Sequence, residues 1–223
     1  MRERYRTQVR EQILDSAETQ IAQSGPASLS LRAVARELGM APSAIHRYFT
    51  SRDDVLTALM VREFDALGEA IDAAEIAVQP RDDYRNRIRA VFGAQREWAL
   101  ANPQSWALLF GSPVPGYVEP HEVCDAANRF VDVVVRIVAE LLASGRTVEK
   151  PPTAMIPRPG SLVPAAGLGG AIPDWQIAAG VAAYAWMCGA ITAELRGTFV
   201  DFVADNEAIY FSEVDHWITE LGL

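Results

Sequence analysis

Apolar residues recur every three or four positions along most of this chain, which is the spacing of one face of an α-helix. The first stripe is followed by Gly25-Pro26, a pair that ends helices. Its members are Val9, Ile13, Leu14, Ala17, Ile21 and Ala22. The pattern therefore predicts a first helix that ends at Gly25.

Start and stop signals for shorter helices follow. Ser30 can cap a second helix, Gly39 closes it, and Pro42 suits the first position of a third helix. Ser51-x-x-Asp54 then resembles a capping box that opens a long fourth helix. The predicted inward-facing residues are Leu31, Val34, Ala35, Leu38, Ile45, Tyr48 and Phe49, then Val55, Leu56, Leu59, Met60 and Phe64.

Helical spacing continues to the end of the chain and predicts helices at about 81–101, 103–110, 120–143, 173–197 and 204–221. Strand-like alternation is absent, so we expect an all-α fold of about nine helices. Residues 144–172 break the pattern with five prolines and five glycines. Such a Pro/Gly-rich loop is either a lid or an insertion without a role, and the sequence leaves both open.

Charge is distributed unevenly along the chain. The formal net charge is −9, yet residues 1–52 carry eight arginines against five acids. The remainder carries 12 basic and 24 acidic residues. This asymmetry predicts one end that faces a polyanion, on a body that repels polyanions.

The segment 175–193 has 19 uncharged residues, which is near the length of a membrane span. It is rich in Ala and Gly, acids flank it, and no Lys/Arg cluster marks a cytoplasmic side. A helix buried inside a soluble protein is the better interpretation. The charged N-terminus has no signal-peptide core and the two cysteines lie far apart, so we expect a cytoplasmic chain without disulfides.

The segment LRAVARELGMAPSAIHRYF (31–49) is interpreted as two short amphipathic helices joined by a tight turn around Gly39. A short helix that is braced in this way fits the major groove of B-form DNA. A plain helical hairpin is the alternative, and the basic bias of this end favours DNA binding. The candidate DNA-binding residues are Arg32, Arg36, Ala41, Pro42, Ser43, Ala44, His46, Arg47, Tyr48 and Arg52.

Residues 7 to about 60 resemble the DNA-binding domain of the TetR family of one-component transcriptional regulators. The resemblance rests on REQILDSAETQIAQSG and SLSLRAVARELGMAPSAIHRYFTSRDDVLTALM. It implies a three-helix helix-turn-helix domain at 1–52, followed by a helical ligand-binding and dimerisation domain at 53–223. The stretch AAYAWMCGAITAELRGTF also resembles a C-terminal subgroup named for a Trp-His-Gly signature, with Cys188 in place of the histidine.

The chain departs from the family pattern at two positions. Ala41 stands where members usually have Ser or Thr as the cap of the recognition helix, and the loss should cost that helix about 1 kcal/mol. His46 stands where many members have a Tyr that contacts phosphate. Imidazole can still donate to phosphate, and does so better when protonated, or His46 is a neutral bystander.

The arginines at positions 2, 4, 6 and 10 precede or begin the first helix. They form either an arm that reaches a minor groove or a solvated tail that attracts phosphate.

Regulators of this family read DNA as dimers, and the last two predicted helices are the candidates for the contact. Small residues along 173–197 allow close approach of a second helix. Packing of these stripes within one chain is the alternative. The candidate interface residues are Ile177, Val181, Tyr184, Cys188, Ile191, Phe211, Val214 and Ile218.

A pocket for an apolar or aromatic molecule is expected among the fourth to eighth helices, because few charges fall on their apolar faces. Each aromatic residue can equally belong to the ordinary core. The candidate pocket residues are Phe92, Trp98, Trp106, Phe110, Tyr117, Phe130 and Trp186.

Signals of catalysis are weak. The three histidines are scattered, and the chain has no Gly-rich phosphate loop and no H-E-x-x-H motif. We therefore expect no catalytic residues, no metal and no cofactor. The expected function is that of a homodimeric repressor released from a palindromic operator by a small molecule; an architectural or ligand-independent DNA-binding protein is the alternative.

Operator affinity is expected to decline from pH 6 to pH 8 more in this protein than in its His46→Tyr variant, because imidazole loses its charge in this range. Gel-shift titrations of both proteins on one operator measure the decline. Identical pH profiles would contradict a phosphate contact by His46.

Overall fold

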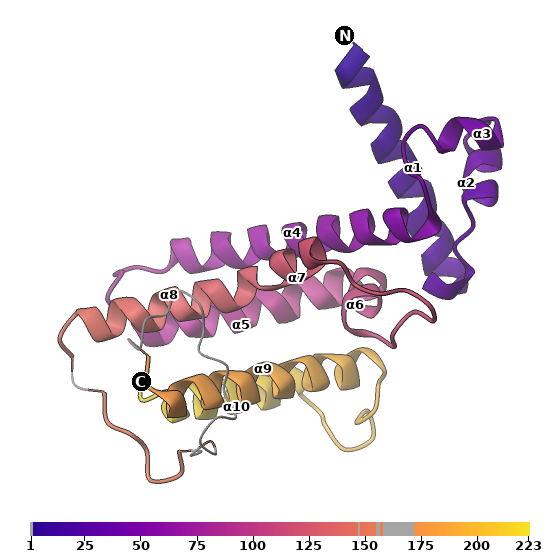
Figure 1. Ribbon diagram of the computed structural model, residues 1–223. Coiled ribbons are helices and arrows are strands. Elements are labelled where there is room, and N and C mark those ends of the chain that lie inside the picture. Colours follow the sequence, from indigo (N-terminus) through magenta and orange to yellow (C-terminus); the bar gives the residue numbers. More distant parts are fainter. Residues whose placement is uncertain (1, 147, 155–156, 158–171) are drawn as a thin grey trace. The chain divides into compact units, whose positions relative to one another are not determined.

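The structure is a computed structural model that describes residues 2–146, 148–154, 157 and 172–223. Within these residues it contains ten α-helices, one short 3-10 helix and no strand, which confirms the all-α prediction (Figure 1). The helices are α1 (Arg2–Ser24), η1 (Pro26–Ser28), α2 (Leu31–Glu37), α3 (Pro42–Ile45), α4 (Arg52–Ala77), α5 (Tyr84–Ala101), α6 (Pro103–Phe110), α7 (His121–Ala127), α8 (Arg129–Ala143), α9 (Asp174–Leu195) and α10 (Asn206–Glu220).

The chain forms two compact units. The first comprises Met1–Ala66 and Asn102–Arg129, and the second comprises Leu67–Ala101 and Phe130–Leu223. Each unit is therefore built from two separate stretches of sequence, and α4 contributes residues to both.

The first unit is organised around the buried faces of α1 to α4. Its core contains most of the predicted inward-facing residues, and its largest members include Ile13, Ile45, Phe49, Leu56 and Leu59. Leu29 joins this core without having been predicted, whereas Ala22 of the first predicted stripe is exposed. A second cluster in this unit joins α4 to α7 through Met60, Phe64 and Val123.

Local chemistry explains where these helices begin and end. Gly25 and Gly39 adopt positive φ angles of 77° and 64°, which glycine reaches without steric cost, and each follows the end of a helix. The hydroxyl of Ser30 accepts a hydrogen bond from the N–H of Ala33 at 3.4 Å, as an N-cap of α2 should.

The predicted capping box at the start of α4 is present. The N–H of Asp54 donates to Ser51 Oγ at 3.0 Å, and the N–H of Ser51 donates back to Asp54 Oδ2 at 3.2 Å. The N–H of Thr50 also donates to Asp54 Oδ2, at 2.9 Å. Hydrogen bonds from Thr50, and then from Ser51, lower the pKa of Asp54 below its usual value of 3.8.

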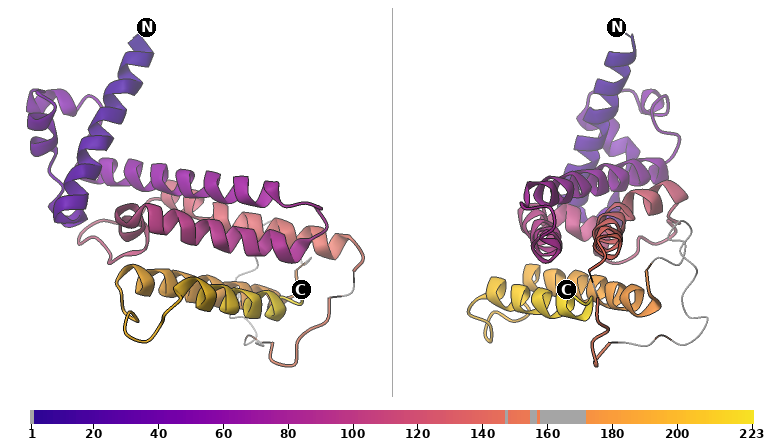
Figure 2. Two further views of the ribbon diagram at one scale, coloured as in Figure 1. Left: turned by 180° about the vertical axis from the view of Figure 1, so that it is seen from behind. Right: turned by 90° about the vertical axis from the view of Figure 1, so that its left-hand side faces the viewer.

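The second unit places the antiparallel pair of α9 and α10 against α5, with α8 beside α5 (Figure 2). Buried side chains come from each of these helices, for example Ile88, Ile137, Met187 and Val214, and also from the end of α4, for example Ile71. Two groups of ion pairs are buried among them, one around Arg87 and one around Arg96.

The expected helix at 120–143 is two helices, α7 and α8, separated at Asn128. The side chain of Asn competes with the backbone for hydrogen bonds and favours helix ends. The break also coincides with the boundary between the units, since α7 belongs to the first and α8, from Phe130 on, to the second. The expected loop at 144–172 lies largely outside the described residues.

Among the described residues, α9 is the one helix whose length and composition would allow it to cross a membrane, with a mean hydropathy of 1.3 over its most apolar stretch. It lies against α5 and α10, and these contacts cover only part of its surface, since Val181 is 61% exposed.

Asp54→Asn is expected to lower the free energy of unfolding near pH 7 and to have little effect at pH 3. The folded-state pKa of Asp54 is lowered, so the charged form stabilises the fold above pH 3.8, and this contribution disappears as the pH falls through the lower folded value. Urea unfolding at pH 7, 5 and 3 measures the difference. The exposed neighbour provides a control, Asp53→Asn; an equal loss for Asp54→Asn at all three pH values would contradict the mechanism.

Candidate nucleic-acid interface and effector cavity

The third helix is short and uncapped by any side chain. α3 covers Pro42–Ile45, and residues 46–48 form a turn. Ala41 holds the extended backbone of an N-cap, with φ −62° and ψ 139°, but supplies no side-chain hydrogen bond. Ala41 thus has the backbone conformation of an N-cap but lacks the side-chain oxygen that would accept a hydrogen bond from α3.

The candidate DNA-binding residues lie mostly on the surface, because Ile45 and Phe49 occupy the inner face of this segment. Ala44, Tyr48 and Arg52 are half-buried. The exposed candidates are Arg32, Arg36, Ala41, Pro42, Ser43, His46 and Arg47. The structure therefore brings seven of the ten to the surface of one small unit.

Two arginines near this surface are bound to the backbone. Arg52 Nη2 donates to the carbonyl of Pro26 at 2.8 Å, and Arg10 Nη1 donates to the carbonyl of Tyr48 at 3.3 Å. The Arg10 guanidinium also lies 4.2 Å from the ring centroid of Phe49. These side chains brace the helix-turn-helix, a role that spacing alone does not reveal.

The N-terminal arginines lie on α1, which begins at Arg2, and not on an extended arm or a tail in front of it. Residues 2–24 contain no glycine or proline, so nothing in this stretch interrupts the helix.

A clamp that the sequence analysis missed joins α1 to α4. Arg62 Nη1 lies 2.8 Å from Asp15 Oδ1, and Nη2 lies 2.5 Å from Glu18 Oε2. The pKa of Glu18 is raised overall, because burial and the charge of Glu63 outweigh the opposing effect of Arg62. Acidic residues at positions 11, 15 and 18 have the spacing of one helix face, which was the available signal.

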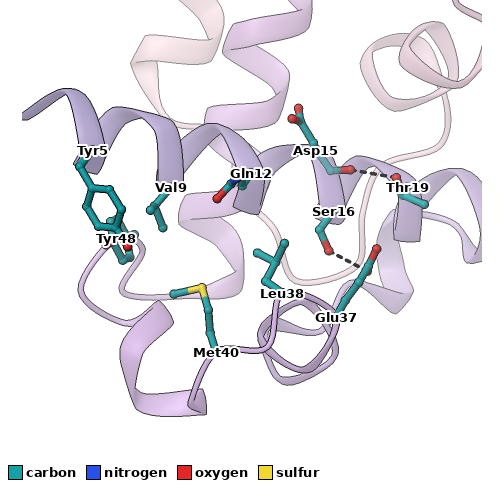
Figure 3. A pocket seen from close by; sticks show the side chains of 10 residues that line it. All are labelled: Tyr5, Val9, Gln12, Asp15, Ser16, Thr19, Glu37, Leu38, Met40 and Tyr48. Atoms are coloured by element: carbon teal, nitrogen blue, oxygen red, sulfur yellow. Dashed lines mark hydrogen bonds between the residues drawn. The ribbon is translucent and has the colours of Figure 1, made fainter.

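An open hollow of about 510 Å³ lies between α1 and the α2–α3 turn (Figure 3). Tyr5 and Val9 border it from α1, and Met40 borders it from the turn (Figure 3). Asp15 and Glu37 also line it, and Glu37 accepts a hydrogen bond from Ser16 at 2.7 Å. These carboxylates repel phosphate, so the part of the hollow that they line does not suit DNA, although Tyr48, a candidate DNA-binding residue, lines it as well.

The aromatic residues expected to line one pocket are divided between the two units. Trp106, Phe110 and Tyr117 belong to the first unit. The rings of Trp106 and Phe110 are 4.1 Å apart, and the hydroxyl of Tyr117 is hydrogen-bonded to Thr57 at 2.8 Å. This group packs within its own unit.

The other four, Phe92, Trp98, Phe130 and Trp186, belong to the second unit. Phe92 and Phe130 meet edge to face at 5.8 Å, and Trp186 stacks on Tyr210 at 5.4 Å.

An apolar cleft of about 250 Å³ lies between α8 and α9 in the second unit. Of the candidate pocket residues, Phe130 lines it, and so do three residues assigned from sequence to the dimer interface: Ile177, Val181 and Tyr184. Its full lining is Phe130, Val131, Val134, Val135, Val138, Ile172, Gln176, Ile177, Gly180, Val181, Tyr184 and Leu221.

The candidate interface residues differ widely in exposure. Ile191, Val214 and Ile218 are fully buried inside the chain, whereas Val181 is 61% exposed. Ile177, Tyr184, Cys188 and Phe211 are half-buried. The three buried residues thus pack within one chain, as the alternative interpretation has it.

The half-buried cysteine is a poor redox sensor. Burial raises the pKa of Cys188 to about 11, against the opposing effect of a hydrogen bond with Tyr184. Its thiol therefore stays protonated, and unreactive, at neutral pH. Cys124 is exposed, and within the described residues no three His, Cys, Asp or Glu side chains gather in a way that could hold a metal.

Comparison with known proteins decides the family. A model of bacterial regulatory proteins of the tetR family matches residues 13–59, and a model of the tetracyclin repressor-like C-terminal domain matches residues 88–217, more than half of the chain. The chain belongs to the TetR family.

Among its TetR-family relatives is the HTH-type transcriptional regulator Rv1816 of Mycobacterium tuberculosis, 40% identical over 141 residues, which are 63% of this chain and 60% of that protein. The chain thus matches about three fifths of the length of these curated relatives. The crystal structure of a candidate regulatory protein, SCO4313, is similar with a TM-score of 0.74 and 28% identity, covering 98% of this chain and 99% of that one. A protein of unknown function from Rhodococcus sp. RHA1 has a TM-score of 0.70 and 26% identity, over 96% and 95% of the two chains.

Ala41→Thr is expected to raise the free energy of unfolding of this TetR-family protein by about 1 kcal/mol, because a hydroxyl at an N-cap can accept a hydrogen bond from the first turn of α3. Ala41→Val, with the same branched shape and no oxygen, is the matched control and should not stabilise. Urea unfolding followed by circular dichroism measures both. Equal stabilities of the two variants would contradict the capping explanation.

Proposed function

We propose that this chain is a cytoplasmic, homodimeric transcriptional repressor that binds a palindromic DNA operator through α2 and α3 and leaves it when an apolar small molecule binds. Membership of the TetR family supports DNA binding and transcription regulation as the activity. The single observation that carries the proposal is the exposed basic surface on a helix-turn-helix whose inner face is fully packed.

Roles on the DNA follow from position. Ser43, Ala44, His46 and Arg47 lie on or just after α3, so they are assigned to the major groove and its edges. Arg32 and Arg36 lie on α2 and are exposed, so they are assigned to phosphates. Arg52 already binds the Pro26 carbonyl. Its proposed contribution is therefore to hold the N-terminus of α4, with the free N–H groups of its first turn, near the phosphates of the DNA.

A second copy of the chain is proposed to pair through α9 and α10. Val181 supports this by its exposure, and Gly180 and Gly189 leave open space beside α9 for close approach of another helix. The likeness of Trp186-Met187-Cys188-Gly189 to the Trp-His-Gly subgroup is part of the same proposal.

Release requires that the effector bind one form of the second unit better than another. α4 is one continuous helix with residues in both units. It is therefore proposed to transmit the conformational change of the second unit to the helix-turn-helix. An architectural DNA-binding protein without operator preference is the other class that the helix-turn-helix permits.

Selection of bound fragments from random duplex DNA is expected to enrich one palindrome. Arg47→Ala should then weaken binding to that palindrome about tenfold or more while weakening binding to random DNA less, because contacts to base edges are worth about 1–3 kcal/mol each. Arg146→Ala removes the same charge from an exposed position in the second unit and should change neither affinity. Flat enrichment would favour the architectural role and contradict the repressor.

A further inference from the structure

The cleft between α8 and α9 has apolar walls and one buried amide. Valines at positions 131, 134, 135 and 138 line it from α8, and Ile177, Gly180 and Val181 line it from α9. The volume of about 250 Å³ exceeds the roughly 150 Å³ of a dry apolar cavity that holds benzene. No side chain that lines it carries a formal charge.

The amide belongs to Gln176, whose side chain is only 2% exposed. Its Nε2 donates to the carbonyl of Leu221 at 2.8 Å. Because a carbonyl only accepts, the nitrogen must face Leu221, and this fixes the orientation of the amide. The other atom, Oε1, is buried and has no partner.

A buried acceptor without a partner destabilises the fold, so its retention next to a cleft calls for a donor. The other polar side chain in the lining is Tyr184, which is hydrogen-bonded to Cys188, and burial raises its pKa, so it stays neutral. A residue that lines the cleft therefore holds one buried acceptor without a partner.

We propose that this cleft binds a small, uncharged, apolar molecule carrying one hydrogen-bond donor, a hydroxyl or an N–H, which it gives to Gln176 Oε1. This rests on the proposed function, of which the molecule would be the effector. An anion is excluded, because no side chain that lines the cleft carries a positive charge to compensate for its desolvation.

The cleft also gives such a molecule a way to act on the dimer. Ile177, Val181 and Tyr184 line the cleft and were assigned from sequence to the interface. An occupant therefore touches the helix on which the proposed pairing depends.

The test uses three probes of similar shape: 1-naphthol, which has a donor, and naphthalene and 1-methoxynaphthalene, which have none. Calorimetry on the full chain should show 1-naphthol binding about three- to tenfold more tightly than the other two. In Gln176→Met this preference should fall to about one. A ratio of affinities within each variant cancels general effects of losing the bond to Leu221.

Gln95→Met is the matched control. Gln95 is also a fully buried amide of the second unit, with both polar atoms unpartnered, but it does not line the cleft. The preference for 1-naphthol should survive in this variant.

Gly180→Leu provides an independent second test. A Cβ at Gly180 meets no atom within 4 Å, so the leucine side chain enters open space beside the cleft on a helix it favours. All three probes should then bind at least tenfold more weakly, while the circular dichroism spectrum is retained.

Three results would overturn the inference: no binding of any probe to the wild-type chain, an unchanged preference in Gln176→Met, or an equal loss of preference in Gln95→Met. The DNA selection on the same preparations keeps the two proposals apart. Enrichment of a palindrome without binding of any probe would contradict the proposed binding cleft and leave the proposed repressor function intact. The expected probe preference together with flat DNA enrichment would support the proposed binding cleft and contradict the proposed repressor function.

Discussion

The ion pairs that hold α4, partly exposed in the first unit and buried in the second, are the constraint on which the rest of the structure depends. In the first unit, Arg62 of α4 binds acids of α1. In the second unit, Glu75 of α4 is fully buried and accepts from Arg87 Nε at 2.6 Å and also from Arg81.

Charges of this kind are costly unless they are paired. Burial alone raises the pKa of Glu75, but hydrogen bonds from Arg87 and Arg81 outweigh it and lower the pKa overall. The carboxylate is therefore ionised at neutral pH, and loss of Arg87 would remove its one fully buried partner. Each unit thus holds its own part of α4 through arginine–carboxylate pairs, partly exposed in the first unit and buried in the second.

Helix boundaries could be predicted from the sequence wherever a capping residue, a glycine or a proline sets them. Gly25, Ser30, Pro42 and the Ser51–Asp54 pair act through bonds within a few residues, so their effect can be predicted without the tertiary structure. The break at Asn128 could not be predicted in this way. The apolar stripe runs through 120–143 without interruption, and the break reflects the change from one compact unit to the other.

The candidate sites show the same division. Outward positions around α3 follow from its period once Ile45 and Phe49 are placed inside, so the surface could be predicted. The partners of Arg10 and Arg52 could not, because they are backbone carbonyls 38 and 26 residues away. Gln176 left no sequence signal at all, since only the fixed Leu221 carbonyl reveals that its oxygen is unpaired.

The stripe on α9 shows how one periodic pattern can serve two surfaces. Val181 and Ile191 belong to the same predicted stripe and are ten residues apart, which at about 100° per residue places them about 80° apart around the helix. They therefore lie at opposite margins of the stripe, and the structure buries Ile191 completely while leaving Val181 61% exposed. One margin belongs to the core of the second unit, and the other borders the apolar cleft. If a second copy pairs through this outer margin, as proposed, an effector in the cleft and the partner chain would contact the same apolar surface, and the pairing would change only where the effector prefers one form of that surface.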